Sequence, residues 1–240
     1  MKKPLKYYWK IKQKIVEKRA YHKYDGRLVL MFHEVSNERE QWYDPAYSIS
    51  VDGFYHLITI IRQSGFLFVS PYDILHNDDR KRVCLTFDDA FQGVYDRVFP
   101  LLRREKIPFT VFPAASLLGK ENYLNENMIR EMMQYTGFYL GAHSVSHCIL
   151  KSASDEQSEY ELRHAKTILE TLFEVPVDIM AYPYGSLREI GKREMKLAQK
   201  SYRYAFSTLQ TCVTPDTDPY CIPRINVNEK NYKTILRETG

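Results

Sequence analysis

Short runs of β-branched or aromatic residues alternate with longer amphipathic segments from residue 27 of the 240-residue chain onward, and this alternation limits the fold more than any other feature. It is typical of a β/α fold with a largely parallel sheet. Most of the short segments are apolar throughout, which indicates strands covered on both faces. The predicted strands are residues 28–33, 66–69, 83–87, 109–112, 138–143, 179–182 and 204–207.

Two of the amphipathic segments have recognisable helix starts. Apolar residues recur at helical spacing behind Asp52, a predicted N-cap, and Gly65 ends that run. Ser154 followed by Gln157 has the spacing of a capping box at the start of a second helix, which Pro176 ends. The composition, 44% hydrophobic and 27% charged, is that of one ordinary globular domain and excludes a disordered, collagenous or coiled-coil chain.

Basic residues are concentrated at the start of the chain. Residues 1–27 carry ten Lys or Arg against two acidic residues, a net charge of +8, whereas the remaining 24 basic and 28 acidic residues leave residues 28–240 at −4. A nucleic-acid-binding fold spreads its basic surface over the whole domain, so the charge pattern argues against a nucleic-acid partner. It indicates a basic arm, residues 1–27, joined to a mildly acidic domain, residues 28–240.

The basic arm has two interpretations. In the first interpretation its Lys-rich face, with Tyr7, Tyr8, Trp9 and Ile11, rests on an anionic membrane surface; in the second the arm is a solvated terminal helix. No run approaches the roughly 18 apolar residues of a membrane-spanning helix, and charges recur where the apolar part of a signal peptide would begin. We therefore expect a cytoplasmic protein, peripheral at the inner membrane face if the first interpretation holds. Four cysteines without a CxxC pair suit a reduced compartment.

The first chemical motif is TFDD at residues 86–89, where two adjacent carboxylates, Asp88 and Asp89, follow an apolar predicted strand. In parallel β/α folds, functional groups collect at the C-terminal ends of the strands. The alternative interpretation is a turn or a helix cap, because adjacent aspartates are common there.

The second motif is GAHSVSH at residues 141–147, again at the end of a predicted strand. On a helical turn, His143 and His147 face the same way and are spaced to chelate one metal ion. The alternative is one surface histidine and one buried, hydrogen-bonded histidine. Taken with the aspartates, the motif supplies three metal ligands and a further carboxylate. A metal hydrolase needs these four groups. Three ligands leave one coordination position open for a water molecule, and the remaining carboxylate takes a proton from that water.

The two motifs, in this order, resemble the first two motifs of the polysaccharide deacetylases, the NodB-homology or carbohydrate esterase family 4 group. AYPYG at residues 181–185 is similar to the Pro-aromatic motif of that family. MFHE at residues 31–34 and GFLFVS at residues 65–70 look like the branch that acts on bacterial surface and adhesin glycans. The resemblance covers residues 28–228 and implies a distorted, incomplete (β/α) barrel with its site at the strand C-termini.

The resemblance also implies roles for individual residues. Asp88 would be the general base, and Asp89, His143 and His147 would hold a divalent metal, usually zinc although related sites accept other ions. The backbone N–H of Tyr184 would donate a hydrogen bond to the oxyanion.

The chain departs from the family pattern in three respects. The usual Asp-and-Trp fourth motif is not visible, since both tryptophans, Trp9 and Trp42, lie far upstream. The family's third motif carries an arginine where this chain has Ala181, and we expect Arg224 to supply that charge from a later strand. The late Leu-x-His motif that provides the general acid is absent, because no histidine follows His164. His33 is the predicted substitute, a histidine that a nearby carboxylate keeps protonated near neutral pH. Alternatively, His33 only fills the rim of the barrel.

The predicted activity is metal-dependent hydrolysis of the acetamide of an N-acetylhexosamine, in a bacterial glycan or a lipid-linked glycan precursor. Two alternatives stay open. In the first, the chain is a catalytically silent relative of the deacetylases that binds glycans. In the second, it is an esterase that removes O-acetyl groups with the same site.

Overall fold

The computed structural model describes residues 26–37 and 44–235. The predicted basic arm lies outside the described residues except for its last two positions. Among the described residues, no helix combines the length and the apolar character needed to cross a bilayer.

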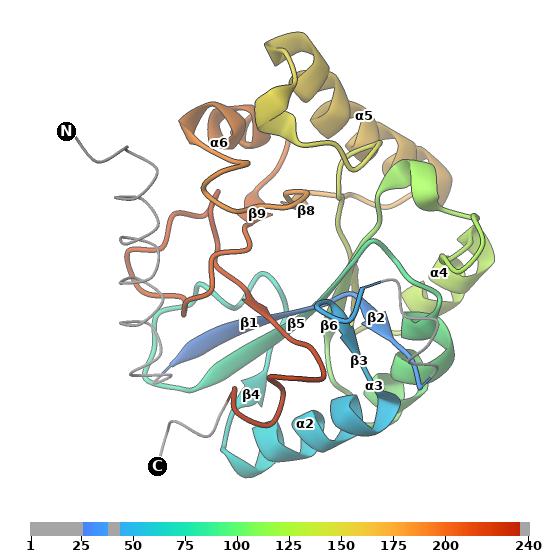
Figure 1. Cartoon of the computed structure of the whole chain (residues 1–240), viewed down its shortest axis with the longest axis vertical. Helices are drawn as coiled ribbons and strands as arrows, with labels where there is room; N and C mark the ends of the chain where they lie inside the picture. The colour runs from blue at the N-terminus through green and yellow to red at the C-terminus, as the bar shows by residue number, and fades with distance from the viewer. Residues whose placement is uncertain (1–25, 38–43, 236–240) are drawn as a thin grey trace, which may run out of the picture.

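Parallel strands form the centre of the fold (Figure 1). One sheet runs in the order β10-β1-β5-β6-β7, with β4 also paired to β5, and β8 pairs with β9. These strands are β1 (Arg27–Phe32), β4 (Leu67–Phe68), β5 (Arg82–Asp88), β6 (Phe109–Phe112), β7 (Phe138–Leu140), β8 (Ile179–Ala181), β9 (Tyr204–Phe206) and β10 (Ile225–Asn226).

Two single-residue bridges join these sheets into a ring. Ala142, just after β7, pairs with Met180 of β8, and Phe206 of β9 pairs with Ile222, just before β10. The ring therefore closes through isolated bridges rather than full strand ladders, as expected for a distorted, incomplete barrel. A further pair, β2 (Glu34–Val35) and β3 (Ser48–Ile49), lies outside this ring.

Helices surround the strands on the outside of the ring (Figure 1). The α-helices are α2 (Val51–Gln63), α3 (Phe99–Arg104), α4 (Glu126–Met133), α5 (Asp155–Phe173) and α6 (Lys192–Gln199). Shorter helical turns are η2 (Val94–Val98), η3 (Ala115–Leu117) and η4 (Leu150–Ser152).

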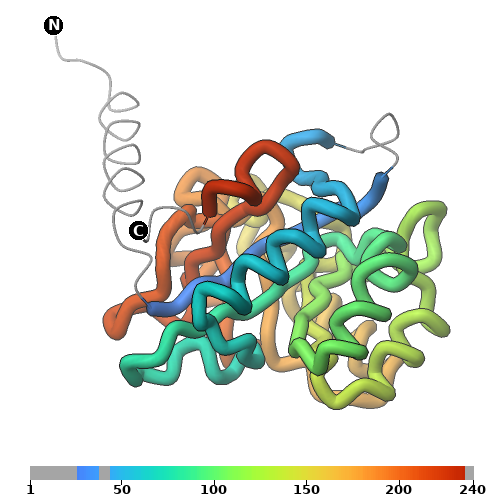
Figure 2. Tube along the Cα trace, turned by 90° about the horizontal axis from the view of Figure 1, so that it is seen from below, coloured from blue at the N-terminus to red at the C-terminus, as the bar shows by residue number. Residues whose placement is uncertain are grey.

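Helix α2 lies along the barrel beside β1 and β5 (Figure 2). Its Phe54 ring packs 5.2 Å from the ring of Phe32 and 6.0 Å from that of Phe87, so the helix buries its apolar side against these strands. The predicted N-cap was wrong by two residues. Ser50, in an extended conformation, accepts a hydrogen bond from the Gly53 N–H, whereas Asp52 is exposed within the first turn.

Helix α5 begins after Ser154 as predicted, but only half of the predicted capping box forms, because the Gln157 side chain donates to Glu161 and not to the N-cap backbone. The Ser154 hydroxyl accepts a hydrogen bond from the Gln157 N–H at 3.2 Å, and Glu174 ends the helix in a left-handed conformation two residues before Pro176. All seven predicted strands are present, although the predicted strand 138–143 ends at Leu140. The three residues removed from it belong to the loop that carries the histidines.

Candidate active site

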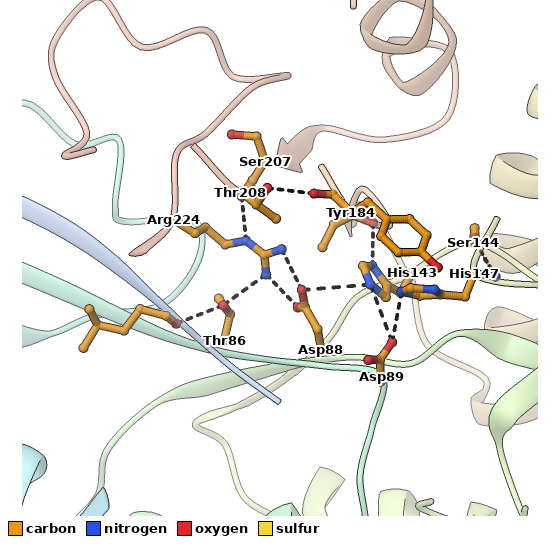
Figure 3. A network of polar contacts seen from close by, with 12 residues as sticks. Thr86, Asp88, Asp89, His143, Ser144, His147, Tyr184, Ser207, Thr208 and Arg224 are labelled. Carbon is orange, nitrogen blue, oxygen red and sulfur yellow. Dashed lines mark hydrogen bonds and ion pairs between the residues drawn. The ribbon is translucent and has the colours of Figure 1, made fainter. Parts of the chain in front are cut away.

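Asp88 and Asp89 lie where the chain leaves the barrel wall. Asp88 is the last residue of β5, and both Asp89 and Ala90 have left-handed backbones, with φ of 63° and 64°. Left-handed residues other than glycine are uncommon and turn the chain abruptly. The turn separates the two carboxylates: Asp88 points toward Arg224, and Asp89 points toward the histidines (Figure 3).

Arg224, just before β10, forms a bidentate ion pair with Asp88. Its two terminal nitrogens lie 2.6 Å and 2.7 Å from the two carboxylate oxygens. Its Nε donates to the Ser207 carbonyl at 2.9 Å, and one terminal nitrogen also donates to the Thr86 hydroxyl at 3.2 Å. The arginine is fully buried. A planar, permanently charged fork suits such bidentate recognition better than lysine does.

The histidines come from a loop, and the predicted helical turn was wrong. Residues 141–148 are not helical, and Ser144 and His147 have left-handed φ values of 62° and 59°. Within this loop the Ser144 hydroxyl accepts a hydrogen bond from the His147 N–H at 2.9 Å. Spacing by four residues therefore brings the two rings together through a compact loop, with ring centroids 4.9 Å apart.

Asp89, His143 and His147 form a cluster that fits a divalent metal. Their ligand atoms lie within 4.8 Å of one another. The Oδ1 atom of Asp89 is 3.7 Å from His143 Nε2 and 3.3 Å from His147 Nε2. This oxygen is buried and has no hydrogen-bond donor among the described residues. One carboxylate and two imidazoles are a common donor set for zinc, and a cation would satisfy the orphaned oxygen.

A backbone carbonyl fixes the ring of His143. Its Nδ1 lies 2.8 Å from the carbonyl oxygen of Ala181, at the end of β8. Because a carbonyl only accepts, Nδ1 carries the proton and Nε2 presents its lone pair toward Asp89. Metal-binding histidines are usually held by such a contact on the second nitrogen.

The two adjacent aspartates have opposite pKa shifts. Burial opposes ionisation of Asp88, but the Arg224 guanidinium outweighs it and lowers the pKa of Asp88 to about 2. Burial, together with the negative charge of Asp88, raises the pKa of Asp89 to about 7. Burial also lowers the pKa of His143 to about 3, so its ring is neutral and suited to bind a metal. A dication between these groups would reverse the shift of Asp89.

His33 follows β1, but its ionisation differs from the expectation. Burial lowers the pKa of His33 to about 4, so the imidazole is neutral near pH 7 and not the protonated acid we predicted. The physical reason is burial, which disfavours the charged imidazolium and outweighs the opposing effect of the Asp88 charge, while Arg224 lowers the pKa of His33 further. The His33 ring packs against Tyr47, with centroids 4.7 Å apart, and its Nδ1 has no partner among the described residues.

Tyr184 borders the cluster from the loop after β8. Its φ is 59°, its carbonyl accepts a hydrogen bond from the Thr208 hydroxyl at 2.7 Å, and its N–H has no hydrogen-bond acceptor among the described residues. The ring is 53% exposed and lies 4.9 Å from the ring of His147. A backbone donor held without a partner beside the ligand cluster matches the predicted oxyanion contact in position.

Sequence reasoning missed three residues that surround the site. Thr86 and Ser207 hold Arg224 in place, and Tyr47 packs on His33. Thr86 carried a signal, since it is the single hydroxyl within an apolar strand. Tyr47 carried none, because the chain has 19 tyrosines.

The fold is a parallel β/α barrel, and its candidate site places a cluster that fits a divalent metal beside an arginine-paired carboxylate. This combination is typical of barrel hydrolases. The family model described as polysaccharide deacetylase matches residues 76–205, and the chain belongs to this family.

Individual relatives agree with this assignment. The poly-beta-1,6-N-acetyl-D-glucosamine N-deacetylase of Staphylococcus epidermidis is 28% identical over 173 residues, which cover 66% of this chain and 59% of that protein. The fold is similar to that of the deacetylase PplD of Streptococcus pyogenes, with a TM-score of 0.78, 22% identity, and coverage of 89% of this chain and 98% of that one. IcaB from Ammonifex degensii gives a TM-score of 0.76 at 22% identity, covering 87% and 94%.

Proposed function

We propose that this chain is a metal-dependent hydrolase that removes the N-acetyl group from N-acetylhexosamine units of a bacterial glycan or a lipid-linked glycan precursor. One observation carries the proposal: the cluster of Asp89, His143 and His147 lies directly beside the Asp88–Arg224 ion pair at the C-terminal ends of the strands. The name of the staphylococcal relative, an N-deacetylase of poly-N-acetylglucosamine, supports the substrate class.

Asp89, His143 and His147 would hold the metal, for which we propose zinc. When bound, a divalent metal supplies Lewis-acid chemistry, lowering the pKa of water and polarising the acetamide carbonyl. The protein's own part begins with Asp88. Its pairing with Arg224 keeps the carboxylate ionised and oriented, and each oxygen retains a second acceptor position after the guanidinium bond. The Oδ2 atom lies 3.9 Å from His143 Nε2, so Asp88 faces the ligand cluster and takes the proton of the attacking water.

The remaining groups bind and orient the substrate. The unpartnered N–H of Tyr184 donates to the oxyanion that develops as the carbonyl is attacked. Tyr47, 42% exposed, and Tyr184 present ring faces on which a sugar can stack. Because His33 is neutral at pH 7, we propose that Asp88, once protonated, returns the proton to the departing amine.

Acetate release from a panel of N-acetylated and O-acetylated saccharides tests the proposal. We expect zinc-loaded protein to release acetate from N-acetylhexosamine oligomers, and chelation to abolish the release. Asp88→Asn should lower kcat by about 10²–10⁴-fold, the usual contribution of a positioned acid–base group. The matched control is Asp52→Asn, an exposed aspartate in the first turn of α2, which should retain full activity.

Other outcomes point to the alternatives. Release from O-acetylated saccharides alone would assign the site to an esterase. Binding of acetylated oligosaccharide without release, whatever divalent metal is supplied, would identify a silent glycan-binding relative. Full activity of Asp88→Asn would contradict the proposed role of Asp88.

A further inference from the structure

We propose that Glu161, on α5, is a positioning residue that sets the metal affinity of the site by holding the loop of His147. The inference rests on the proposed function, because it assumes that His147 binds a metal. Glu161 lies outside every motif discussed above, and it is only 3% exposed although it carries a carboxylate. A buried carboxylate requires hydrogen-bond donors. Three of the donors to Glu161 belong to one loop, and a fourth, the side-chain amide of Gln157 on α5 itself, lies at 3.4 Å.

Glu161 binds two of the three residues between the histidines, Val145 and Ser146, through three hydrogen bonds. Its Oε2 accepts from the N–H groups of Val145 at 2.9 Å and Ser146 at 2.8 Å. Its Oε1 accepts from the Ser146 hydroxyl at 2.7 Å. Two successive backbone N–H groups thus converge on one oxygen. The left-handed residues Ser144 and His147 stand on either side of this pair, and such backbones persist only where the surroundings fix them.

The effect of Glu161 falls on His147 more than on His143. His143 has independent supports, because its N–H donates to the Pro113 carbonyl at 3.0 Å and its ring is held by the Ala181 carbonyl. Within the described part of the chain, the ring of His147 makes no hydrogen bond to another residue, and its ion-pair contact is to Asp89. The position of the His147 ring therefore depends on its backbone, which follows directly after the segment that Glu161 holds.

Metal titration of the full-length protein tests the inference. Apoprotein is titrated with Zn²⁺ by calorimetry and with Co²⁺ by visible absorption, which reports ligand geometry. We expect Glu161→Ala to raise the Kd at least about ten-fold and to alter the Co²⁺ spectrum. Glu161→Gln should bind nearly as the wild type does, because the amide oxygen still accepts both N–H groups.

Glu194→Ala is the matched control for general loss of stability. Glu194 is also a buried helical glutamate, 1% exposed, and it accepts from the Gly191 N–H at 2.7 Å in a different part of the fold. We expect Glu194→Ala to lower the Tm without changing the Kd. If Glu161→Ala does not fold, Glu161→Asp replaces it in the test. This variant moves the carboxylate away from the loop by one methylene, and we expect it to raise the Kd as well.

A double variant tests whether Glu161 acts through His147. In a His147→Ala background, Glu161→Ala should cause no further loss of metal affinity, whereas in a His143→Ala background it should. An unchanged Kd in Glu161→Ala, or an equal change in Glu194→Ala, overturns the inference while the proposed function stands. If the wild-type protein binds neither Zn²⁺ nor Co²⁺, both the inference and the proposed function are overturned.

Discussion

Asp88 and Arg224 are the residues whose chemistry depends most on each other. Both are buried, and 136 residues separate them in the chain. Burial alone would raise the pKa of Asp88 and leave a protonated acid, which cannot take a proton from water. The guanidinium reverses that shift, so the pair maintains the charged form that the proposed reaction needs.

Replacing Arg224 by Met should therefore move the acid limb of the kcat/KM profile to higher pH. Without the guanidinium, burial dominates, the pKa of Asp88 rises, and the base is lost as the pH falls toward that new value. We also expect the free energy of unfolding to drop by about 3–5 kcal/mol, because one charge stays buried without its partner. The measurements are a pH–rate profile and urea denaturation.

Arg82→Met is the control for this prediction. Arg82 is also buried and pairs with Asp78 at 2.5 Å, but it lies at the first residue of β5, at the other end of the strand. The Arg82→Met variant should lose stability, but the acid limb of its kcat/KM profile should stay in place. An acid limb that stays in place in Arg224→Met would show that the arginine does not govern Asp88.

His33 provides a second prediction for a single residue. Because its pKa of about 4 leaves it neutral at pH 7, His33→Gln should lower kcat by less than about ten-fold at saturating substrate, far less than Asp88→Asn. Steady-state kinetics on both variants make the comparison. A loss of about 10²-fold or more in His33→Gln would restore it as the general acid.

At the scale of the elements, α5 links the fold to the site, since it carries Glu161 beneath the histidine loop. Ser154→Ala removes the hydroxyl that caps this helix and should lower the free energy of unfolding by about 1 kcal/mol. Thr167→Ala, on an exposed position of the same helix, also removes a hydroxyl but no cap, and should change stability by less than about 0.5 kcal/mol. Equal effects in urea denaturation would contradict the capping role.

The elements also differ in how well their pattern predicted them. The seven predicted strands had apolar runs, and all were found. Full burial demands such runs in β1, β5, β6 and β8, whereas Leu67 of β4 is exposed. The strands β2 and β3 have two residues each, too few for any periodicity to appear. The histidine loop was predicted as a helical turn because four-residue spacing suits a helix. Its left-handed residues are stabilised by hydrogen bonds from distant segments, which no local pattern reveals.

At the scale of the whole molecule, the buried titratable groups should make the metal-free protein sensitive to acid. The pKa values of His33 and His143 are about 4 and about 3 in the fold, against 6.5 for an ordinary histidine. Between pH 6.5 and 4 the unfolded chain therefore binds two protons that these residues do not bind in the fold. Asp89 opposes this, because its raised pKa lets the folded state hold a proton that the unfolded state releases.

The balance of protons bound by these groups gives the sign of the change in stability with pH. His33 and His143 against Asp89 leave about one extra proton on the unfolded state, and His147, whose pKa burial also lowers, adds to it. Stability should therefore fall by at least roughly 1.4 kcal/mol per pH unit as the pH drops from about 6 to 4. Urea denaturation of chelator-treated protein at several pH values measures this slope. Zinc-loaded protein should show a steeper loss, because the metal requires Asp89 ionised. A stability that rises on acidification would contradict the pKa shifts.

The basic arm belongs to the same scale, and we propose that it brings the enzyme to an anionic membrane surface. Its net charge of +8 stands against −4 on the rest of the chain, and basic residues near such a surface contribute about 1 kcal/mol each. In liposome flotation, the intact chain should float with anionic vesicles and remain behind with neutral ones. Equal flotation by a chain lacking residues 1–20 would remove this proposal.

The sequence by itself determined the β/α class, seven of the strands, and the candidate ligands and proposed base, because these depend on local patterns and on short motifs at strand ends. Tertiary structure alone decided that Arg224 pairs with Asp88, that His33 is neutral, and that Glu161 holds the histidine loop. Each of these depends on the distance between groups remote in the chain and on their removal from water. Burial and charges from distant segments determine the protonation and the position of these side chains, and a local sequence pattern predicts neither of them.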